Sequence, residues 1–163
     1  MNAIDILLQD HAEIKKVLKS ITESKNTALK SRKTLMTKLS DLIKVHTTLE
    51  EKLVYPLTLK NRSLEKLTRE AYEEHNAVDM LLKKALKVEV NDPSWLAKFK
   101  VIKENLEHHI DKEEEQKMFP ALKKILPKQD LEEIGDKMLI LKKNLITKSK
   151  KKKEKVQHKK EVN

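Results

Sequence analysis

The sequence predicts an all-α protein, an antiparallel up-down-up-down four-helix bundle, and three observations support this prediction. Apolar residues recur at helical spacing along most of the chain, as at Ile14, Val17, Leu18 and Ile21. The 163 residues include one glycine and four prolines, too little glycine for the turns of a sheet protein or for phosphate-binding loops. Parts of the sequence also repeat with an offset of 64 residues, so two similar helical hairpins can face each other.

The apolar stripes divide the body of the chain into four long helices and a short extra helix near the C-terminus. They fall at about residues 4–24, 29–55, 63–88, 93–119 and 131–141. Pro56 ends the second helix, while Asp92 caps the fourth and Pro93 begins it. Gly135 falls inside the short fifth helix, where a glycine lowers helix stability.

The composition excludes several classes of site. Because the chain has no cysteine, it cannot form disulfides, thiolate zinc sites or iron–sulfur clusters, and any metal must be bound by imidazole and carboxylate. Only five aromatic residues are present, which argues against recognition of nucleic acid by base stacking. The N-terminus lacks the features of a signal peptide, and no apolar stretch is long enough to span a membrane. We therefore expect a cytoplasmic protein.

The formal charge of +10 is concentrated at the C-terminus. Residues 142–163 hold ten lysines and two glutamates, so we expect a bundle domain over residues 1–141 followed by a lysine-rich tail, disordered or a frayed helix, over 142–163. This tail is either a solvated terminus or an electrostatic contact with an anionic partner, such as nucleic acid or a membrane surface. The candidate anion-binding residues are Lys150, Lys151, Lys152 and Lys153.

Histidines and carboxylates recur at matched positions of the two halves. The matched motifs are Asp10-His11 with Glu74-His75, and His46-x-x-x-Glu50 with His109-x-x-x-Glu113. Four residues advance an α-helix by about 400°, so the imidazole and carboxylate of each spaced pair share one face and can share one metal site. A single histidine or a single His–Glu pair on a helix is usually a core or solvated group. Four of the six histidines at matched positions favour a metal site instead.

The chain resembles the hemerythrin-like (HHE cation-binding) domain family over about residues 3–125. The motifs that carry the resemblance are Ile4-Asp5-x-Leu7-Leu8-x-Asp10-His11, His46-x-x-x-Glu50-Glu51 with Tyr55-Pro56, Glu74-His75, and His108-His109 with Glu113-Glu114-Glu115 and Phe119-Pro120. The resemblance implies a non-haem diiron centre, oxo- or hydroxo-bridged, in which two glutamates bridge the irons. The implied ligands are His11, His46, Glu50, His75, His109 and one glutamate after His109.

The identity of the last ligand stays open between two neighbours. Glu113 keeps the four-residue spacing from His109 and is slightly favoured, whereas Glu114 keeps the repeat register with Glu50 and would need a π-bulge to reach the same face. His108 points about 100° away from His109, which argues against it as a ligand. His158 is expected to be exposed in the tail.

The oxygen carriers of this family use a fifth histidine, one turn from the third, and this chain lacks it. The positions one turn either side of His75 are Ala71 and Asp79, so that place is vacant or taken by Asp79, water or another group. Asp79 is therefore a candidate neighbour of the metals. Asp10 and Glu74 are expected to orient the histidines from behind.

The resemblance implies a module that binds or reacts with O₂, nitric oxide or peroxide. Oxygen or redox sensing, protection against stress and iron handling are the roles it suggests, and whether the protein is an enzyme stays open. Imidazole and carboxylate also bind manganese or zinc, so the metal is not fixed by the ligands. The alternative function is a helical protein that attaches to nucleic acid or an anionic surface through its tail, and the third is a metal-free interaction bundle.

Overall fold

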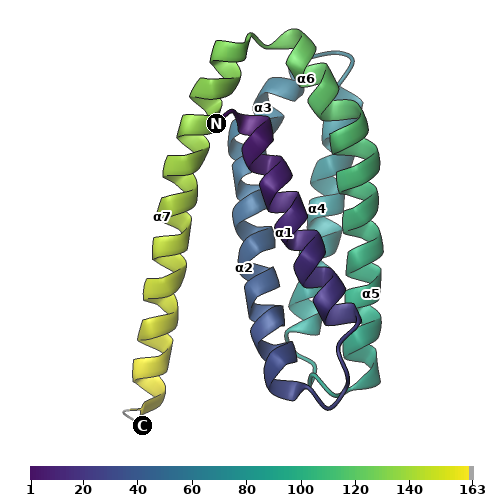
Figure 1. The fold of residues 1–163 in the computed structure, drawn as a ribbon, viewed down its shortest axis with the longest axis vertical. Helices are drawn as coiled ribbons and strands as arrows, with labels where there is room; N and C mark the ends of the chain where they lie inside the picture. The colour runs from purple at the N-terminus through teal and green to yellow at the C-terminus, as the bar shows by residue number, and fades with distance from the viewer. Residues whose placement is uncertain (162–163) are drawn as a thin grey trace.

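A computed structural model describes the backbone of residues 1–161 and the side chains of residues 1–157. Within this range every regular element is helical, and the all-α prediction is confirmed. Figure 1 shows the helices side by side in a bundle, with the last helix along one flank. The elements are α1 (Ala3–Thr22), α2 (Leu29–Leu53), α3 (Tyr55–Thr58), α4 (Glu65–Ala85), α5 (Pro93–Glu107), η1 (His108–Met118), α6 (Phe119–Ile125) and α7 (Lys128–Glu161).

Three consecutive helical segments form one continuous helix in the bundle, and the middle segment is unusual. The helices α5, η1 and α6 follow one another without a break, and η1 is a π-helix of 11 residues. Asp92 caps the start of this continuous helix by accepting a hydrogen bond from the backbone N–H of Ser94, and Pro93 occupies the first turn, as the sequence predicts. In a π-helix the N–H bonds to the carbonyl five residues earlier, so residues five apart share a face.

The hydrophobic core is divided into two parts by a polar layer. One part lies around Ile14, Ile43, Val78 and Ile110 toward one end of the bundle. The other lies toward the opposite end and includes Leu7 of α1, Tyr55 of α3 and Phe119 of α6. Along each helix the buried histidines fall between residues of these two parts, so the fold places them in the middle of the bundle with apolar packing on both sides.

Helix α7 differs from the predicted short helix and basic tail. It is one helix of 34 residues that continues through the lysine-rich segment to Glu161. Lysine has a good helix propensity, and nothing after Pro127 interrupts the helix. Contacts with α1 and α2 also anchor it, including ion pairs from Lys142 to Asp10 and from Lys153 to Asp41.

Gly135 allows α7 to approach the start of α1 closely. A Cβ atom at this position would lie 2.4 Å from the carbonyl oxygen of Met1 and 3.0 Å from the backbone nitrogen of Ala3. Glycine lowers the intrinsic stability of this helix, but packing requires it because a larger side chain would collide with the start of α1. None of the helices in the described part of the chain is long and apolar enough to cross a lipid bilayer.

Candidate metal centre

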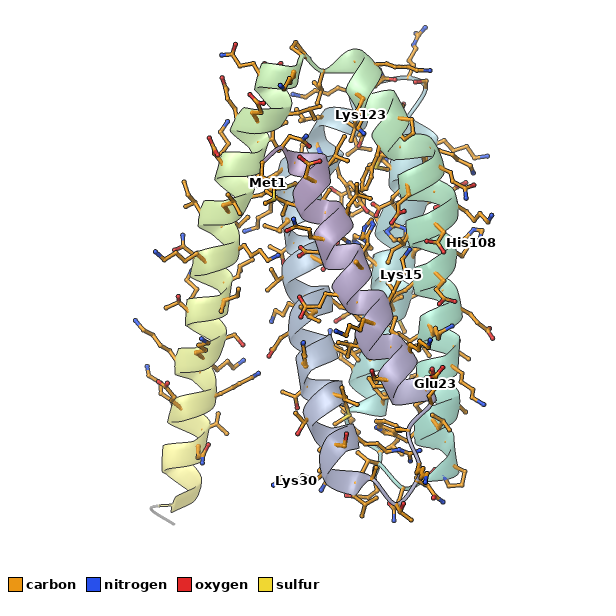
Figure 2. All side chains as sticks on the ribbon, in the orientation of Figure 1. Met1, Lys15, Glu23, Lys30, His108 and Lys123 are labelled. Atoms are coloured by element: carbon orange, nitrogen blue, oxygen red, sulfur yellow. The ribbon has the colours of Figure 1, made fainter. Side chains whose placement is uncertain are left out.

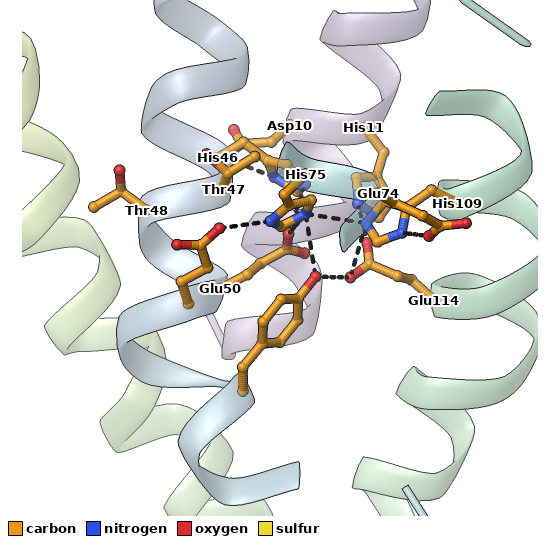
Figure 3. A network of polar contacts seen from close by, with 12 residues as sticks. Asp10, His11, His46, Thr47, Thr48, Glu50, Glu74, His75, His109 and Glu114 are labelled. Atoms are coloured by element: carbon orange, nitrogen blue, oxygen red, sulfur yellow. Dashed lines mark hydrogen bonds and ion pairs between the residues drawn. The ribbon is translucent and has the colours of Figure 1, made fainter. Parts of the chain in front are cut away.

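The four matched histidines meet in the polar layer at the centre of the bundle. They come from four different elements, with His11 on α1, His46 on α2, His75 on α4 and His109 on η1. Figure 3 shows their rings directed toward one another, with the carboxylates of Glu50 and Glu114 among them. All six side chains are buried. These four helices thus bring the predicted histidines together in a region shielded from water.

The side chains form two groups that share a carboxylate. One group comprises His11, His46, Glu50 and Glu114, and the other comprises Glu50, His75 and His109. Glu50 Oε2 lies 3.2 Å from His46 Nε2 and 3.4 Å from His75 Nε2. This oxygen therefore faces one histidine of each group.

Glu114 lies between the same two groups from the opposite side. Its Oε2 is 3.1 Å from His11 Nε2, and its Oε1 is 3.5 Å from His109 Nε2. Each carboxylate oxygen of Glu114 thus faces a different histidine pair. This is the arrangement expected of a carboxylate that bridges two cations.

The π-helix explains why Glu114, and not the slightly favoured Glu113, reaches this centre. Four-residue spacing would put Glu113 on the face of His109 in an α-helix, but η1 brings residues five apart onto one face. The structure accordingly groups Glu113 with Glu74 and His108, away from the central histidines. The preference for Glu113 rested on regular α-helical geometry, which this segment lacks.

Carboxylates also lie behind the histidines, on the Nδ1 side of each ring. His11 Nδ1 donates to Glu115 Oε1 at 2.9 Å, His75 Nδ1 to Glu51 Oε1 at 2.9 Å, and His109 Nδ1 to Glu74 Oε2 at 2.6 Å. His46 Nδ1 lies 3.9 Å from Asp10 Oδ2. Fixing the Nδ1 proton in this way leaves Nε2 as the atom that faces the centre, as in known metal-binding histidines.

All four carboxylates face a histidine on another helix, and two of them do so although a histidine follows them directly in the sequence. Asp10 and Glu74 precede His11 and His75, but they face His46 and His109 instead. The sequence analysis did not single out Glu51 and Glu115 for this role. A signal was present, because the two glutamates are also separated by the 64-residue offset of the repeat.

The ionisation of the central groups reflects their mutual charges. Burial alone would lower the pKa of His46, but the negative charge of Glu50 and the nearby Asp10 carboxylate raise it to about 10. Burial would likewise lower the pKa of His75, but the nearby Glu50 carboxylate and the hydrogen bond to Glu51 raise it to about 9. The pKa of Glu50 is well below its usual value, because the His46 charge outweighs burial. Without metal, protons therefore balance the buried carboxylates.

Several central atoms still lack a hydrogen-bond partner among the described residues. Both oxygens of Glu50, Oε2 of Glu114, Nε2 of His11 and both ring nitrogens of His46 are buried and unsatisfied. The close Nε2–carboxylate distances are thus not aligned as hydrogen bonds. An unsatisfied buried polar group costs about 1–3 kcal/mol, so a cluster of them requires compensation. Metal cations fit, because these lone pairs converge on shared positions and all belong to imidazole or carboxylate ligands.

An aromatic residue at matched positions contacts one histidine of each group. Phe119 stacks on His11 with ring centroids 5.6 Å apart, and Tyr55 stacks on His75 at 5.4 Å. Tyr55 also brings its hydroxyl to the centre, 3.1 Å from His75 Nε2 and donating at 3.1 Å to Glu114 Oε1. Burial, with the charge of Glu50, raises the pKa of Tyr55 well above its usual value, so the phenol keeps its proton. This hydroxyl is an additional functional group that the sequence analysis did not assign.

The other candidate residues lie away from the centre. Asp79 is 57% exposed at its side chain and pairs with Lys83, because the buried stripe of α4 passes through Val78 instead. The four lysines Lys150–Lys153 are exposed on α7. Three of them line a groove of about 1030 Å³ against α2. The side chain of His158 lies outside the described residues.

Comparison with known proteins agrees with this geometry. The family model described as the hemerythrin HHE cation-binding domain matches residues 2–122. A crystal structure of a hemerythrin HHE cation-binding domain-containing protein from Mycobacterium kansasii is 29% identical in sequence, with a TM-score of 0.77. The similarity covers 89% of this chain and 87% of that one. No curated protein matches the chain significantly.

Proposed function

Because the chain belongs to the hemerythrin HHE cation-binding domain family, we propose that its central histidines and glutamates bind two iron ions that bind or react with O₂, nitric oxide or peroxide. One ion would be held by His11 and His46, and the other by His75 and His109. Glu50 and Glu114 would bridge them within an antiparallel four-helix bundle.

The observation that supports two ions rather than one is the position of the two carboxylates. Glu50 faces a histidine of each pair through one oxygen, and Glu114 faces one through each of its oxygens. The unsatisfied ring nitrogens of His11 and His46 require one cation on their side, and the Nε2 atoms of His75 and His109, which lie 3.1 Å apart, would hold the second. Two cations satisfy all six side chains with the shared carboxylates between them.

The bound iron would supply the electrons and open coordination positions for a small oxygen or nitrogen species, and the chain supplies the surroundings. The carboxylates behind His11, His75 and His109 keep the Nε2 atoms directed inward. The apolar core on both sides excludes water. The Tyr55 hydroxyl lies next to His75 and donates its proton to Glu114, so it could donate to a small polar ligand in place of that bond.

The direct test measures the metal content and absorption spectrum of the full chain purified without added metal. We expect about two irons per chain, with charge-transfer bands that appear when the reduced protein meets air. A matched pair of variants provides the control: Glu114→Ala should lower the iron content, whereas Glu107→Ala should not, because Glu107 is a half-buried residue of α5 that pairs with Lys103. Protein that contains no transition metal even after anaerobic reconstitution with ferrous iron would refute the assignment.

The ligands do not distinguish iron from manganese or zinc, so the physiological role needs a separate assay. The reduced protein should be mixed with O₂, nitric oxide or hydrogen peroxide, and its spectrum followed with time. Repeated consumption of peroxide or nitric oxide would establish an enzyme of stress protection. A reversible spectral change on binding would instead indicate a sensor or carrier.

A second function is supported by the lysines of α7. Lys148, Lys150, Lys152 and Lys153 line one groove and give it a positive rim, which suits an anionic partner such as nucleic acid. Deletion of residues 148–163 would preserve the pair between Lys142 and Asp10 near the centre. Salt-sensitive binding of duplex DNA that disappears on this deletion, with iron content unchanged, would establish the second function. Equal binding by the deleted protein would exclude it.

A further inference from the structure

The π-helix creates a second histidine–glutamate pair beside the central one. His108 and Glu113 are five residues apart, as are His109 and Glu114, so each pair shares a face of η1. His108 Nε2 lies 3.8 Å from Glu113 Oε1. The second pair is shifted by one residue from the first and therefore faces away from the buried centre.

Glu74 approaches this pair from α4 and completes a cluster of three metal-binding side chains. One potential ligand atom from each of Glu74, His108 and Glu113 lies within 4.8 Å of the others. The same Glu74 carboxylate accepts the 2.6 Å hydrogen bond from His109 Nδ1. The cluster is thus distinct from the central ligands but connected to them through one hydrogen bond.

Glu113 is the residue whose burial calls for a ligand. It is only 7% exposed, and no group in the described part of the chain makes a hydrogen bond to its Oε2. When it is ionised, the neighbouring carboxylate of Glu74 adds negative charge and has no proton to donate to this oxygen. Two carboxylates this close need a shared proton or a cation between them.

The cluster is accessible to a hydrated ion. Glu74 and Glu113 lie at the end of a surface cleft of about 640 Å³, which Glu70 and Glu73 also line. The side chain of His108 is 61% exposed. Figure 2 shows His108 on the outer side of its helix. An ion could therefore reach the cluster from solvent without opening the bundle.

We propose that Glu74, His108 and Glu113 form a third metal site, which binds a divalent transition cation such as Fe²⁺ or Mn²⁺. One imidazole and two carboxylates suit these ions, and exposure on the cleft side leaves room for water ligands. None of its three members is a proposed central ligand, and the hydrogen bond from His109 to Glu74 connects the site to the centre. It accounts for the unsatisfied oxygen of Glu113, which the central pair leaves unexplained.

The test is Mn²⁺ binding to the full-length, metal-replete protein, measured as loss of the free Mn²⁺ signal in electron paramagnetic resonance. The wild type is expected to bind one Mn²⁺ beyond its central metals. His108→Ala and the nearly isosteric Glu113→Gln should each weaken this binding by about 10-fold or more. Glu70→Gln, in the same cleft but outside the cluster, serves as the matched control and should bind as the wild type does.

The iron content of every variant is measured in parallel. A protein that lacks the two proposed central irons is therefore recognised independently of the result for the third site. If the centre itself took up Mn²⁺, that fraction would persist in His108→Ala, and only the additional site would disappear. Wild-type affinity in both His108→Ala and Glu113→Gln would overturn the third site. So would the absence of any additional Mn²⁺ in the wild type, and a proton shared between Glu74 and Glu113 would then explain the cluster.

Discussion

Removing a carboxylate that binds a histidine Nδ1 should weaken only one of the two metal positions, because each carboxylate contacts a histidine of one pair. Glu51 accepts from His75 Nδ1, and Glu115 accepts from His11 Nδ1, both at 2.9 Å. Removing such a partner typically lowers metal affinity about 10–100-fold. The Glu51 and Glu115 side chains are 38% and 30% exposed, so water can replace part of each interaction. We therefore expect losses near the lower limit, about 10-fold, or about 1.4 kcal/mol.

The assay is retention of iron during dialysis against increasing chelator, expressed as iron per chain. Glu51→Ala should release first the ion near His75, and Glu115→Ala the ion near His11, so each variant should pass through a state with about one iron. Glu51→Gln keeps a hydrogen-bond acceptor but loses the charge, and should fall between Glu51→Ala and the wild type. Iron retention close to the wild type in Glu51→Gln would mean that Glu51 mainly orients the His75 ring, and retention close to Glu51→Ala would mean that its charge matters most.

The matched control is Glu73→Gln, an exposed glutamate on α4 that makes no hydrogen bond to a histidine among the described residues. It should retain iron as the wild type does. If Glu51→Ala and Glu115→Ala also retain both irons at every chelator concentration, the carboxylates do not support the ligands. Simultaneous loss of both irons in either variant would contradict the division into two histidine pairs.

Three further predictions concern protonation, packing and the phenol. The pKa values of His46 and His75 are about 10 and about 9, above the usual 6.5. Protonation of these histidines therefore stabilises the fold fully below pH 6.5, and this contribution is lost as the pH rises through 9 to 10. The melting temperature of the metal-free protein should fall over that range. Gly135→Ala should destabilise the fold by about 1–3 kcal/mol in denaturant titrations, because the close approach to Met1 outweighs the gain in helix propensity. A Gly135→Ala protein as stable as the wild type would show that α7 does not pack closely on α1. Tyr55→Phe should keep two irons but change the rate at which the reduced protein reacts with peroxide; an unchanged rate would exclude a role for the hydroxyl.

The sequence carried more information about the last glutamate than its helical spacing suggested. The repeat offset is 63 residues from His46 to His109 but 64 from Glu50 to Glu114, which means that the second half has one additional residue between histidine and glutamate. A π-helix is the way a continuous helix accommodates one inserted residue. The local four-residue rule favoured Glu113, whereas the change of offset indicated Glu114.

The contacts behind the histidines could not be assigned from sequence neighbours alone. Adjacent residues on a helix point about 100° apart, so the acid before a histidine faces a different helix from the histidine itself. Only the packing of four helices decides that Asp10 faces His46 and Glu74 faces His109. The repeat identifies these acids as equivalent, but the identity of their partners depends on the tertiary structure.

The lysine-rich segment was difficult to predict for a different reason. Its composition lacks the apolar residues of a packed helix, yet α7 is anchored by charge, with Lys142 paired to Asp10 and Lys153 to Asp41. Burial would raise the pKa of Asp10, but the nearby His46 ring and the hydrogen bond from Lys142 lower it below the usual value. Lys142 thus touches the acid behind a central histidine. Removing the whole segment from residue 142 would perturb the centre, and the separation of functions requires the shorter deletion from residue 148.

The approximate twofold symmetry of the centre is broken at the aromatic positions. Tyr55 and Phe119 are equivalent by the 64-residue offset, and each stacks on a histidine of a different pair. Only Tyr55 carries a hydroxyl, and this hydroxyl contacts His75 and Glu114. Two ions in this centre would therefore have matched ligands but different neighbours, one beside a hydrogen-bond donor and the other beside an apolar ring. We therefore expect a small polar ligand to bind beside Tyr55 when the hydroxyl is released from Glu114, and the Tyr55→Phe variant tests this expectation.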